Sequence, residues 1–516
     1  MKIDGLFSYP VVYLRNFRKL EFISISSSMK KLILFCLVFS FSDLSIAQSC
    51  FPGFEPFTRQ GQIDSFQTNF PGCTNIEGFL SIEGPGILNL YGLNVVQSIA
   101  GLHIREADNL TTLAGLESLR NIGHHLSISS NPNLQNLSGL SGVHTISGTA
   151  VINRNSKLTN LGMISLSRIN GGLYINANPE LQTLALNSLV SIGNDFSIIA
   201  NPALTDLSGL GSLKAIGGTY SILNNANLVH LGEHNNLHTI GIDLTIEGNP
   251  GLNELSEFSS LQEIFGDLTI SGNGSLPSLT GLQNLQHVYG FISIKNNNLL
   301  SSLTGLDSLV HAGNISIYKN GALNDLSGLS SLSLVEGDLE IVINDQLETL
   351  HGLNSLFSIQ KDLVIFKNKK LTSLTGIDLL QFIGGRLDIV FNPLLSACDV
   401  TSVCNHLAAS GSNEIGGNFT GCKTIDEILN QCSVDVIDPE SENEIVLYPN
   451  PTADYVEING VKDEITLIRI FDTYGRLVKI SYLNDSAIYL STLPAGLYSV
   501  FIQSKKQNTT KWIIKI

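Results

Sequence analysis

The stretch that decides the fold is Gly266-Asp-Leu-Thr-Ile270-Ser-Gly-Asn273-Gly-Ser-Leu276, one copy of a pattern that recurs through most of the chain. With its isoleucine numbered 0, leucine stands at −2 and +6 and asparagine at +3. The isoleucine recurs at Ile128, Ile152, Ile175, Ile198, Ile222, Ile246, Ile270, Ile294, Ile317, Ile341, Ile365 and Ile389. The asparagine recurs at Asn131, Asn155, Asn178, Asn201, Asn225, Asn249, Asn273, Asn297, Asn320, Asn344, Asn368 and Asn392. Successive asparagines are 23 or 24 residues apart, and a repeat of this length predicts a solenoid.

Each copy predicts one coil of that solenoid. The Leu-x-Ile step alternates with polar residues, which is typical of a short strand with one face inward. After the asparagine, apolar residues follow at every third position, as in Leu276, Leu279 and Leu282. This spacing favours short extended segments joined at corners over a helix. Two weaker copies at Ile82 and Ile104 bring the total to fourteen.

The recurring asparagine predicts an internal ladder. Its side-chain amide can pair with backbone groups of the coils above and below, which the bend would otherwise leave unsatisfied. A single coil cannot bury enough apolar surface to offset the ordering of its backbone, so the coils are stable only as a stack.

The beginning of the chain predicts export. Residues 1–28 resemble neither a domain nor a signal and are interpreted as a non-native extension, with translation starting at Met29. Residues 29–47 have a basic start, an apolar core and a small-residue site, so we expect a signal peptide cleaved after Ala47. The apolar run is too short to span a bilayer, and no other run qualifies.

The charge balance argues against two classes of partner. Residues 1–47 hold six of the 29 Lys and Arg and three of the 45 Asp and Glu, which leaves 23 against 42 and a net charge of −19. Such an acidic chain disfavours nucleic acid and anionic membranes.

Six cysteines remain after the signal peptide, at Cys50, Cys73, Cys398, Cys404, Cys422 and Cys432. An even number in an exported chain predicts disulfides. We expect Cys50 to pair with Cys73, whereas the last four allow three pairings. A metal site in that last group is the alternative, although no Cys-x-x-Cys pair is present. A lipid on Cys50 is a further alternative.

The repeat resembles the leucine-rich repeat, with one extra residue between the asparagine and the next leucine. The Ile-x-Gly step before the strand, as in Ile264-Phe-Gly266, makes it similar to the receptor L domain. The resemblance implies a mainly β, right-handed solenoid over residues 78–395, between an N-terminal cap at 48–77 and a cysteine-containing cap at 396–432. It implies little about function, because such solenoids serve many binding roles.

The end of the chain differs in kind. Residues 433–443 are acidic and lack the repeat, so they are interpreted as a linker. Residues 444–516 alternate strands with turn signals and predict a small immunoglobulin-like β-sandwich. The key motif residues are Tyr448, Pro449, Asn450, Pro451, Gly475 and Gly496.

These C-terminal motifs, in this order, resemble the type A sorting domain of the type IX secretion system. The resemblance implies a bacterium of the Bacteroidota group, Sec export to the periplasm, and recognition of residues 444–516 by the outer-membrane translocon. The protein would then be secreted or held on the outer cell surface. The alternative is an unrelated immunoglobulin-like adhesion module.

Signatures of catalysis are missing from the sequence. There is no Gly-x-Ser-x-Gly, His-Glu-x-x-His, P-loop or Gly-x-Gly-x-x-Gly motif. Aspartates recur at position −3, as in Asp243, Asp267 and Asp338, and this recurrence suits turn capping better than acid–base chemistry. We therefore expect a non-enzyme without cofactor or metal. The alternative is a carbohydrate-active enzyme, a lyase or a glycosidase, on the same scaffold.

Position +1 carries the candidate ligand surface. Four consecutive coils have apolar side chains there, Tyr318, Val342, Phe366 and Val390, which strand alternation points outward. Exposed apolar stripes usually mark interaction sites, so we predict that this surface binds an extracellular glycan or protein. We expect the protein to be a monomer. Acidic residues that could supply hydrogen-bond acceptors flank it, namely Asp338, Glu340, Asp362 and Asp388. The alternative is that the stripe is covered by the sorting domain or by the segment around Cys398–Cys432.

Overall fold

The structure is a computed structural model, and it describes residues 50–51, 55–232, 236–409, 412–432, 446–448, 450, 452–459, 465–472, 477–481, 487–494, 496–504 and 508–515. The predicted extension 1–28, signal peptide 29–47, cleavage site after Ala47 and linker 433–443 lie outside the described residues.

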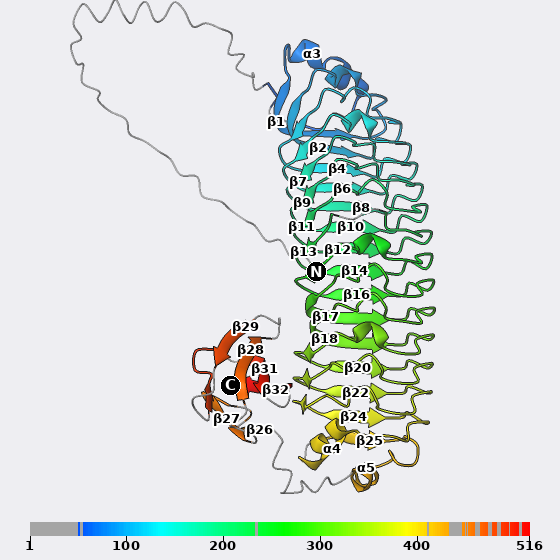
Figure 1. Ribbon diagram of the computed structural model, residues 1–516. Coiled ribbons are helices and arrows are strands. Elements are labelled where there is room, and N and C mark those ends of the chain that lie inside the picture. The colour runs from blue at the N-terminus through cyan, green and yellow to red at the C-terminus, as the bar shows by residue number, and fades with distance from the viewer. Residues whose placement is uncertain are drawn as a thin grey trace, which may run out of the picture. The chain divides into compact units, whose positions relative to one another are not determined.

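The repeats form a stack of coils that share one parallel sheet of 25 strands (Figure 1). The strands that carry positions −2 to +1 are β1 (Asn75–Glu83), β2 (Ser98–Arg105), β4 (Leu126–Ser129), β6 (Ala150–Asn153), β8 (Leu173–Asn176), β10 (Phe196–Ile199), β12 (Tyr220–Leu223), β14 (Leu244–Glu247), β16 (Leu268–Ser271), β17 (His287–Lys295), β18 (His311–Tyr318), β20 (Leu339–Val342), β22 (Leu363–Phe366) and β24 (Leu387–Val390). These fourteen strands confirm the predicted number of coils.

A second, shorter strand precedes the main one in most coils. These strands are β3 (Asn121–Ile122), β5 (Thr145–Ile146), β7 (Arg168–Ile169), β9 (Ser191–Ile192), β11 (Ala215–Ile216), β13 (Thr239–Ile240), β15 (Glu263–Ile264), β19 (Leu334–Val335), β21 (Ser358–Ile359) and β23 (Phe382–Ile383). The strands β1, β2, β17 and β18 cover both positions without a break. In four coils a short 3-10 turn follows the main strand, namely η1 (Tyr91–Leu93), η2 (Ser138–Leu140), η3 (Ser256–Phe258) and η4 (Ser327–Leu329).

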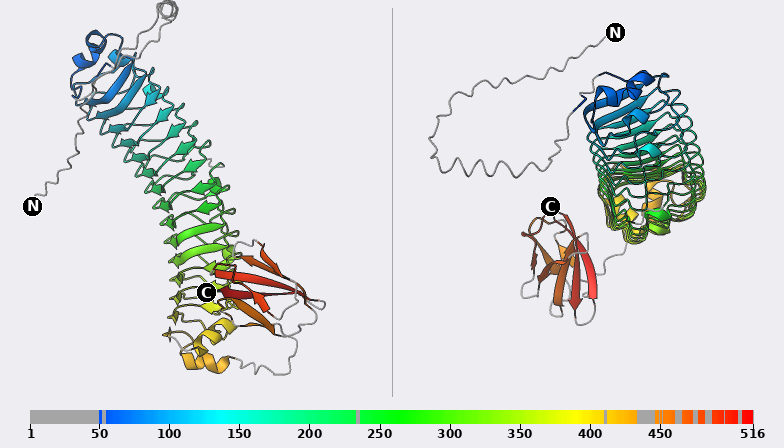
Figure 2. Two further views of the ribbon diagram at one scale, coloured as in Figure 1. Left: turned by 90° about the vertical axis from the view of Figure 1, so that its left-hand side faces the viewer. Right: turned by 90° about the horizontal axis from the view of Figure 1, so that it is seen from above.

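The register follows the repeat without slippage between coils. Ile128 pairs with Ile152, and Ile246 with Ile270, so each position meets its own equivalent in the next coil. The isoleucine at 0 is buried in all fourteen coils, as are the third-position leucines such as Leu276 and Leu279. Seen along the solenoid axis, the coils superpose around this continuous core (Figure 2).

Glycines at one corner allow close contact between coils. Gly281 has φ +121°, and a Cβ there would overlap the carbonyl oxygen of Leu255 in the preceding coil. Gly328 occupies the equivalent corner within η4 and approaches Leu303 in the same way, without a positive φ. Close packing is therefore the shared requirement at this corner, and the left-handed backbone is needed only where the 3-10 turn is absent.

The asparagines at +3 form an uninterrupted ladder inside the bend. Each Nδ2 donates to the carbonyl oxygen of the position-0 isoleucine in the preceding coil, at 2.7–3.0 Å. Each Oδ1 accepts the backbone N–H of the +3 residue in that coil, at 2.9–3.2 Å. The ladder begins at Ala107 N–H and ends at Asn418, a rung that the sequence analysis missed. Asn418 follows Asn392 after 26 residues, which breaks the regular period although Ile415 still precedes it by three.

A disulfide, aromatic rings and short helices close the N-terminal end of the solenoid. Phe57 bridges Ile82 of β1 in parallel and extends the sheet. Phe51, Phe57 and Phe66 pack edge to face above the first coil, beside α2 (Gln60–Asp64) and α3 (Phe66–Asn69). Cys50 and Cys73 are joined by a disulfide. These groups cover apolar surface that an open end would expose.

The C-terminal end is closed by a further strand and two helices. The strand β25 (Glu414–Gly416) pairs with β24, and α4 (Thr401–Ala408) and α5 (Ile425–Gln431) follow the last coil. Disulfides join Cys398 to Cys422 and Cys404 to Cys432, the pairing that the sequence left open.

The C-terminal domain consists of two antiparallel sheets. One contains β26 (Val446–Tyr448), β27 (Tyr455–Asn459) and β30 (Ala487–Tyr489), and the other β28 (Ile465–Asp472), β29 (Leu477–Ser481), β31 (Gly496–Ser504) and β32 (Asn508–Lys515). Val456 and Ile488 of the first sheet share a buried core with Ile468, Val500 and Ile513 of the second. The predicted two-sheet domain is thereby confirmed. In the part of the chain that the structure describes, every helix is too short or too polar to cross a membrane.

The ladder makes a prediction for Asn273. Its Nδ2 donates to Ile246 O at 2.9 Å, and its Oδ1 accepts Asn249 N–H at 3.2 Å, with all these groups buried. Asn273→Ala should therefore lower the free energy of unfolding by about 1–3 kcal/mol, because it strands buried backbone groups. Urea denaturation measures this loss.

The matched control is Asn253→Ala, which removes an exposed asparagine of the neighbouring coil. We expect that change to stay within about 0.5 kcal/mol, the usual range for surface positions. Equal losses for the two variants would contradict a structural role of the ladder.

Candidate ligand surface

The predicted stripe lies on consecutive strands of the sheet. The register pairs Tyr318 of β18 with Val342 of β20, Val342 with Phe366 of β22, and Phe366 with Val390 of β24. Tyr318 is 37% exposed, and Val342 and Phe366 are half-buried. The first three residues therefore form a continuous, partly exposed apolar column.

Val390 does not belong to the exposed column, and this part of the prediction is wrong. Its side chain is only 6% exposed. The sheet continues past β24, because β25 adds a strand that places Gly416 opposite Val390. The sequence analysis took the coil of Val390 for the last one, whereas the cap supplies a further strand over it.

A second column, at position +2, contributes to the same surface and was missed. The +2 residue has a positive φ in every coil from Glu106 to Phe391, between +51° and +68°. In this left-handed region glycine and asparagine are favoured, and other L-residues are strained by about 1–2 kcal/mol. Gly248, Gly272 and Asn296 fit that preference and were the available signal. Ile343 and Phe391, at φ +57° and +60°, go against it.

The two columns meet at the C-terminal coils. Phe391 is 53% exposed, and its ring lies 5.8 Å from that of Phe366 in an edge-to-face arrangement. The ammonium of Lys367 lies 4.8 Å from the Phe366 ring centroid and 5.8 Å from that of Phe391, which is within cation–π range. We name the set formed by Tyr318, Val342, Ile343, Phe366 and Phe391 the C-terminal apolar surface.

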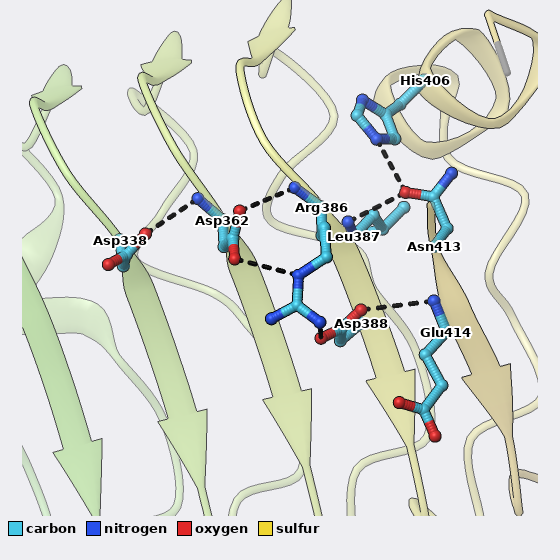
Figure 3. Close-up of polar contacts among 8 residues, drawn as sticks. All are labelled: Asp338, Asp362, Arg386, Leu387, Asp388, His406, Asn413 and Glu414. Carbon is cyan, nitrogen blue, oxygen red and sulfur yellow. Dashed lines mark hydrogen bonds and ion pairs between the residues drawn. The ribbon is translucent and has the colours of Figure 1, made fainter. Parts of the chain in front are cut away.

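Three of the four predicted acidic acceptors are engaged in the scaffold (Figure 3). Asp338 Oδ1 accepts the backbone N–H of Asp362 at 3.0 Å, and Asp362 Oδ1 accepts that of Arg386 at 2.8 Å. Asp388 Oδ1 accepts the backbone N–H of Glu414 at 3.2 Å. These carboxylates tie neighbouring coils together, as the turn-capping interpretation of position −3 predicts for the first two.

The side chain of Arg386 joins two of these acids (Figure 3). Its Nε lies 3.2 Å from Asp362 Oδ2, and one terminal nitrogen lies 3.3 Å from Asp388 Oδ2. The hydrogen bond to Asp362 and the charges of both carboxylates raise the pKa of Arg386. At the cap, Asn413 Oδ1 accepts the backbone N–H of Leu387 at 3.0 Å. Glu340 is the remaining acid of the predicted set, and within the described residues its carboxylate has no hydrogen-bond or ion-pair partner.

A separate aromatic cluster, also missed, lies at the N-terminal ends of β17 and β18 and includes Phe265 of the preceding coil. The rings of Phe265 and Tyr289 stack at 5.5 Å with an interplanar angle of 11°. His311 Nε2 lies 3.0 Å from Glu336 Oε1. Burial lowers the pKa of the nearby His287, and the charge of Glu263 opposes this shift. Among the described residues, no group of three His, Cys, Asp or Glu side chains could hold a metal ion.

The sorting-motif residues that the structure describes lie on or beside the strands of the C-terminal domain. The hydroxyl of Tyr448 donates to Glu457 Oε2 at 2.9 Å, and this bond raises the pKa of Tyr448. Asn450 Nδ2 donates to Trp512 O at 2.8 Å, and Gly496 begins β31. Pro449, Pro451 and Gly475 lie outside the described residues.

Comparison with known proteins identifies two segments. Residues 446–516 match the family model described as the secretion system C-terminal sorting domain, and residues 72–185 match that of the receptor L domain. No curated protein matches the chain.

Among solved structures, the chain is similar to one chain of the crystal structure of a TLR13–ssRNA13 complex, with 17% identity and a TM-score of 0.26. The similarity covers 72% of this chain and 61% of that chain.

The sorting domain indicates export to the cell exterior. The protein is therefore a secreted or outer-surface solenoid in which residues 72–185 are similar to the receptor L domain and residues 446–516 to the secretion system C-terminal sorting domain.

Proposed function

We propose that the protein is a non-catalytic binding or adhesion module whose ligand contacts the C-terminal apolar surface. The receptor L-domain match supports a binding role, because this kind of solenoid typically serves as a binding fold. The surface itself supplies the contact. Aromatic and aliphatic side chains on adjacent strands give a ligand a wide apolar area at a low cost in side-chain entropy.

The observation that carries the proposal is the pair of bulky side chains at position +2. From Glu106 to Phe391 the +2 residues share a left-handed backbone, and Ile343 and Phe391 are the bulky apolar ones among side chains that are otherwise small, polar or charged. Because the turn imposes this backbone on every coil, the scaffold itself gives no reason for a bulky apolar side chain at +2. Because Phe391 stays 53% exposed, burial in the core does not explain it.

The second candidate function is a lyase or glycosidase on the same scaffold. A glycosidase needs a pair of carboxyl groups free to face the substrate. Asp338, Asp362 and Asp388 each accept a backbone N–H instead, and this supports a non-catalytic binding protein over an enzyme. Incubation with a panel of polysaccharides tests it. Saturable binding without shorter products is expected, and depolymerisation would favour the enzyme.

Export depends on the translocon binding residues 444–516. Deletion of this segment should leave the protein in the periplasm of a host that has the type IX machinery. The solenoid should keep the melting temperature that it has in the full chain, because its core is separate from that of the C-terminal domain. Cell fractionation and thermal unfolding measure the two effects. Normal surface delivery of the shortened chain would refute the sorting role.

The apolar surface can be tested with Tyr318→Ser combined with Phe366→Ser in the full chain. Binding to a glycan or protein array should be lost while the melting temperature is kept, because both rings are partly exposed. The matched control replaces the other aromatic pair, Phe265→Ser with Tyr289→Ser, and should leave binding intact. If only the Tyr318→Ser, Phe366→Ser variant has a lower melting temperature, these side chains stabilise the fold by packing, and the proposed ligand site is wrong.

A trade-off between stability and binding is expected at Ile343. Ile343→Asn should raise the free energy of unfolding by about 1 kcal/mol, because asparagine tolerates the left-handed backbone better. The same change should weaken ligand binding, since it removes an apolar contact. The reverse change, Asn296→Ile, should lower stability by a similar amount. If the Ile343→Asn protein is stabilised and its ligand binding is unchanged, the side chain of Ile343 does not contribute to binding.

A further inference from the structure

Lysines accompany the apolar side chains along the two outward columns. Lys295 stands at position +1 of β17, one coil before Tyr318. Lys319 and Lys367 stand at position +2, each with a positive φ, in the coils that carry Tyr318 and Phe366 at +1. The surface therefore alternates cationic and apolar groups over consecutive coils.

Within the described part of the chain, no carboxylate lies within 4.0 Å of the ammonium groups of Lys295, Lys319 or Lys367. The neighbouring Lys369 and Lys370 behave differently, because they pair with Asp345 at 2.7 Å and Glu348 at 3.9 Å in the preceding coil. Unpaired cations on an exposed surface leave their charge available to a ligand.

The local charge is opposite to that of the whole chain, which has a formal net charge of −16. Across positions −1, +1 and +2 from β17 to β24, the acidic residues are Glu340 and Asp388. Asp388 is 8% exposed and is paired with Arg386. Asp338 and Asp362 stand at −3, two residues beyond the −1 column, where each accepts a backbone N–H of the next coil. Acids beyond the Debye length of about 8 Å at physiological ionic strength are largely screened from a ligand lying on this surface.

We propose that the surface binds an anionic polysaccharide, one whose sugars carry carboxylate or sulfate groups, an inference that rests on the proposed binding function. The apolar faces of Tyr318, Phe366 and Phe391 suit the C–H faces of sugar rings. The lysines between them suit the acidic groups. Strands about 4.8 Å apart place Lys319 and Lys367, two coils apart, at a spacing of about 10 Å. This is close to the length of a disaccharide, so alternate sugars of an extended chain can each meet one lysine.

Charge density favours a glycan over a nucleic acid. A nucleic acid strand carries a phosphate on every nucleotide, and its binding proteins follow it with a continuous positively charged groove. Here Val342 and Ile343 occupy the coil between Lys319 and Lys367, and the chain as a whole is acidic. Sparse charge between apolar contacts fits a polymer with sparse acidic groups.

The experiment measures the affinity of the full chain for three probes by calorimetry: polygalacturonate with carboxylates, a sulfated galactan, and an uncharged galactan. Binding to at least one charged probe and weak binding to the uncharged one is expected, with affinity falling as salt rises. Tighter binding of polygalacturonate would identify carboxylate as the recognised group, and tighter binding of the sulfated galactan would identify sulfate. A single-stranded DNA oligonucleotide and an acidic peptide serve as competing ligand classes.

Two variants test the lysines directly. Lys319→Gln with Lys367→Gln should weaken binding of the preferred probe on the order of tenfold, because contacts to ionised groups are lost. The matched control, Lys369→Gln with Lys370→Gln, should bind like the original protein. Glu340→Gln should bind more tightly, because it removes an acid from the same face. Unchanged melting temperatures show that each variant is folded.

The outcomes separate this inference from the proposed function. The inference is overturned if neither charged probe binds, if the uncharged galactan binds as well, if the oligonucleotide or peptide binds more tightly, or if the Lys319 and Lys367 variant binds like the original. In each case the binding function stands if the Tyr318 and Phe366 variant still loses its array ligand. If that variant loses nothing, the proposed function fails first.

Discussion

The solenoid depends on one interaction, the hydrogen bonding of a buried asparagine amide to the backbone of the preceding coil. At position +3 the chain turns out of its strand, and the N–H at +3 and the carbonyl oxygen at 0 lose their strand partners. The amide of the next coil supplies both, as Asn273 does for Asn249 N–H and Ile246 O. Because each rung completes the coil before it, the stack needs a final rung, which Asn418 of the cap provides. Stability is therefore shared between neighbours and does not belong to any single coil.

The same turn also creates the surface that we assign to the ligand. To place the amide inside, the +2 residue adopts a left-handed backbone, and the side chains at +1 and +2 are left on the outer face. The fold strictly requires the left-handed backbone at +2, but it places little restriction on which side chains stand at +1 and +2. Lysine, isoleucine and phenylalanine can therefore replace glycine and asparagine there at a modest loss of stability, as at Lys367, Ile343 and Phe391. The asparagine ladder thus holds the coils together while the side chains in the +1 and +2 columns can differ from coil to coil and contact a ligand.

The regular features of the structure were predictable from the sequence, and the exceptions arise where the period is broken. The strands, their register and the ladder positions follow from alternation and the 23 or 24-residue spacing. Asn418 was missed because 26 residues separate it from Asn392, a spacing that the cap introduces. The same cap strand buries Val390, which strand alternation alone places outside. Alternation likewise assigns no special backbone to +2, so the contribution of Phe391 and Ile343 needed the φ angles.

Hydrogen exchange at the ladder amides tests the central claim most directly. The backbone N–H of Asn249 lies outside the strands and donates to Asn273 Oδ1. If the ladder completes the coils, peptides that carry the +3 amides should exchange as slowly as those of the strands, along the whole solenoid including Asn392. Exchange of these amides at the rate of the exposed corners, with the strands still protected, would show that the coils hold together without the asparagines.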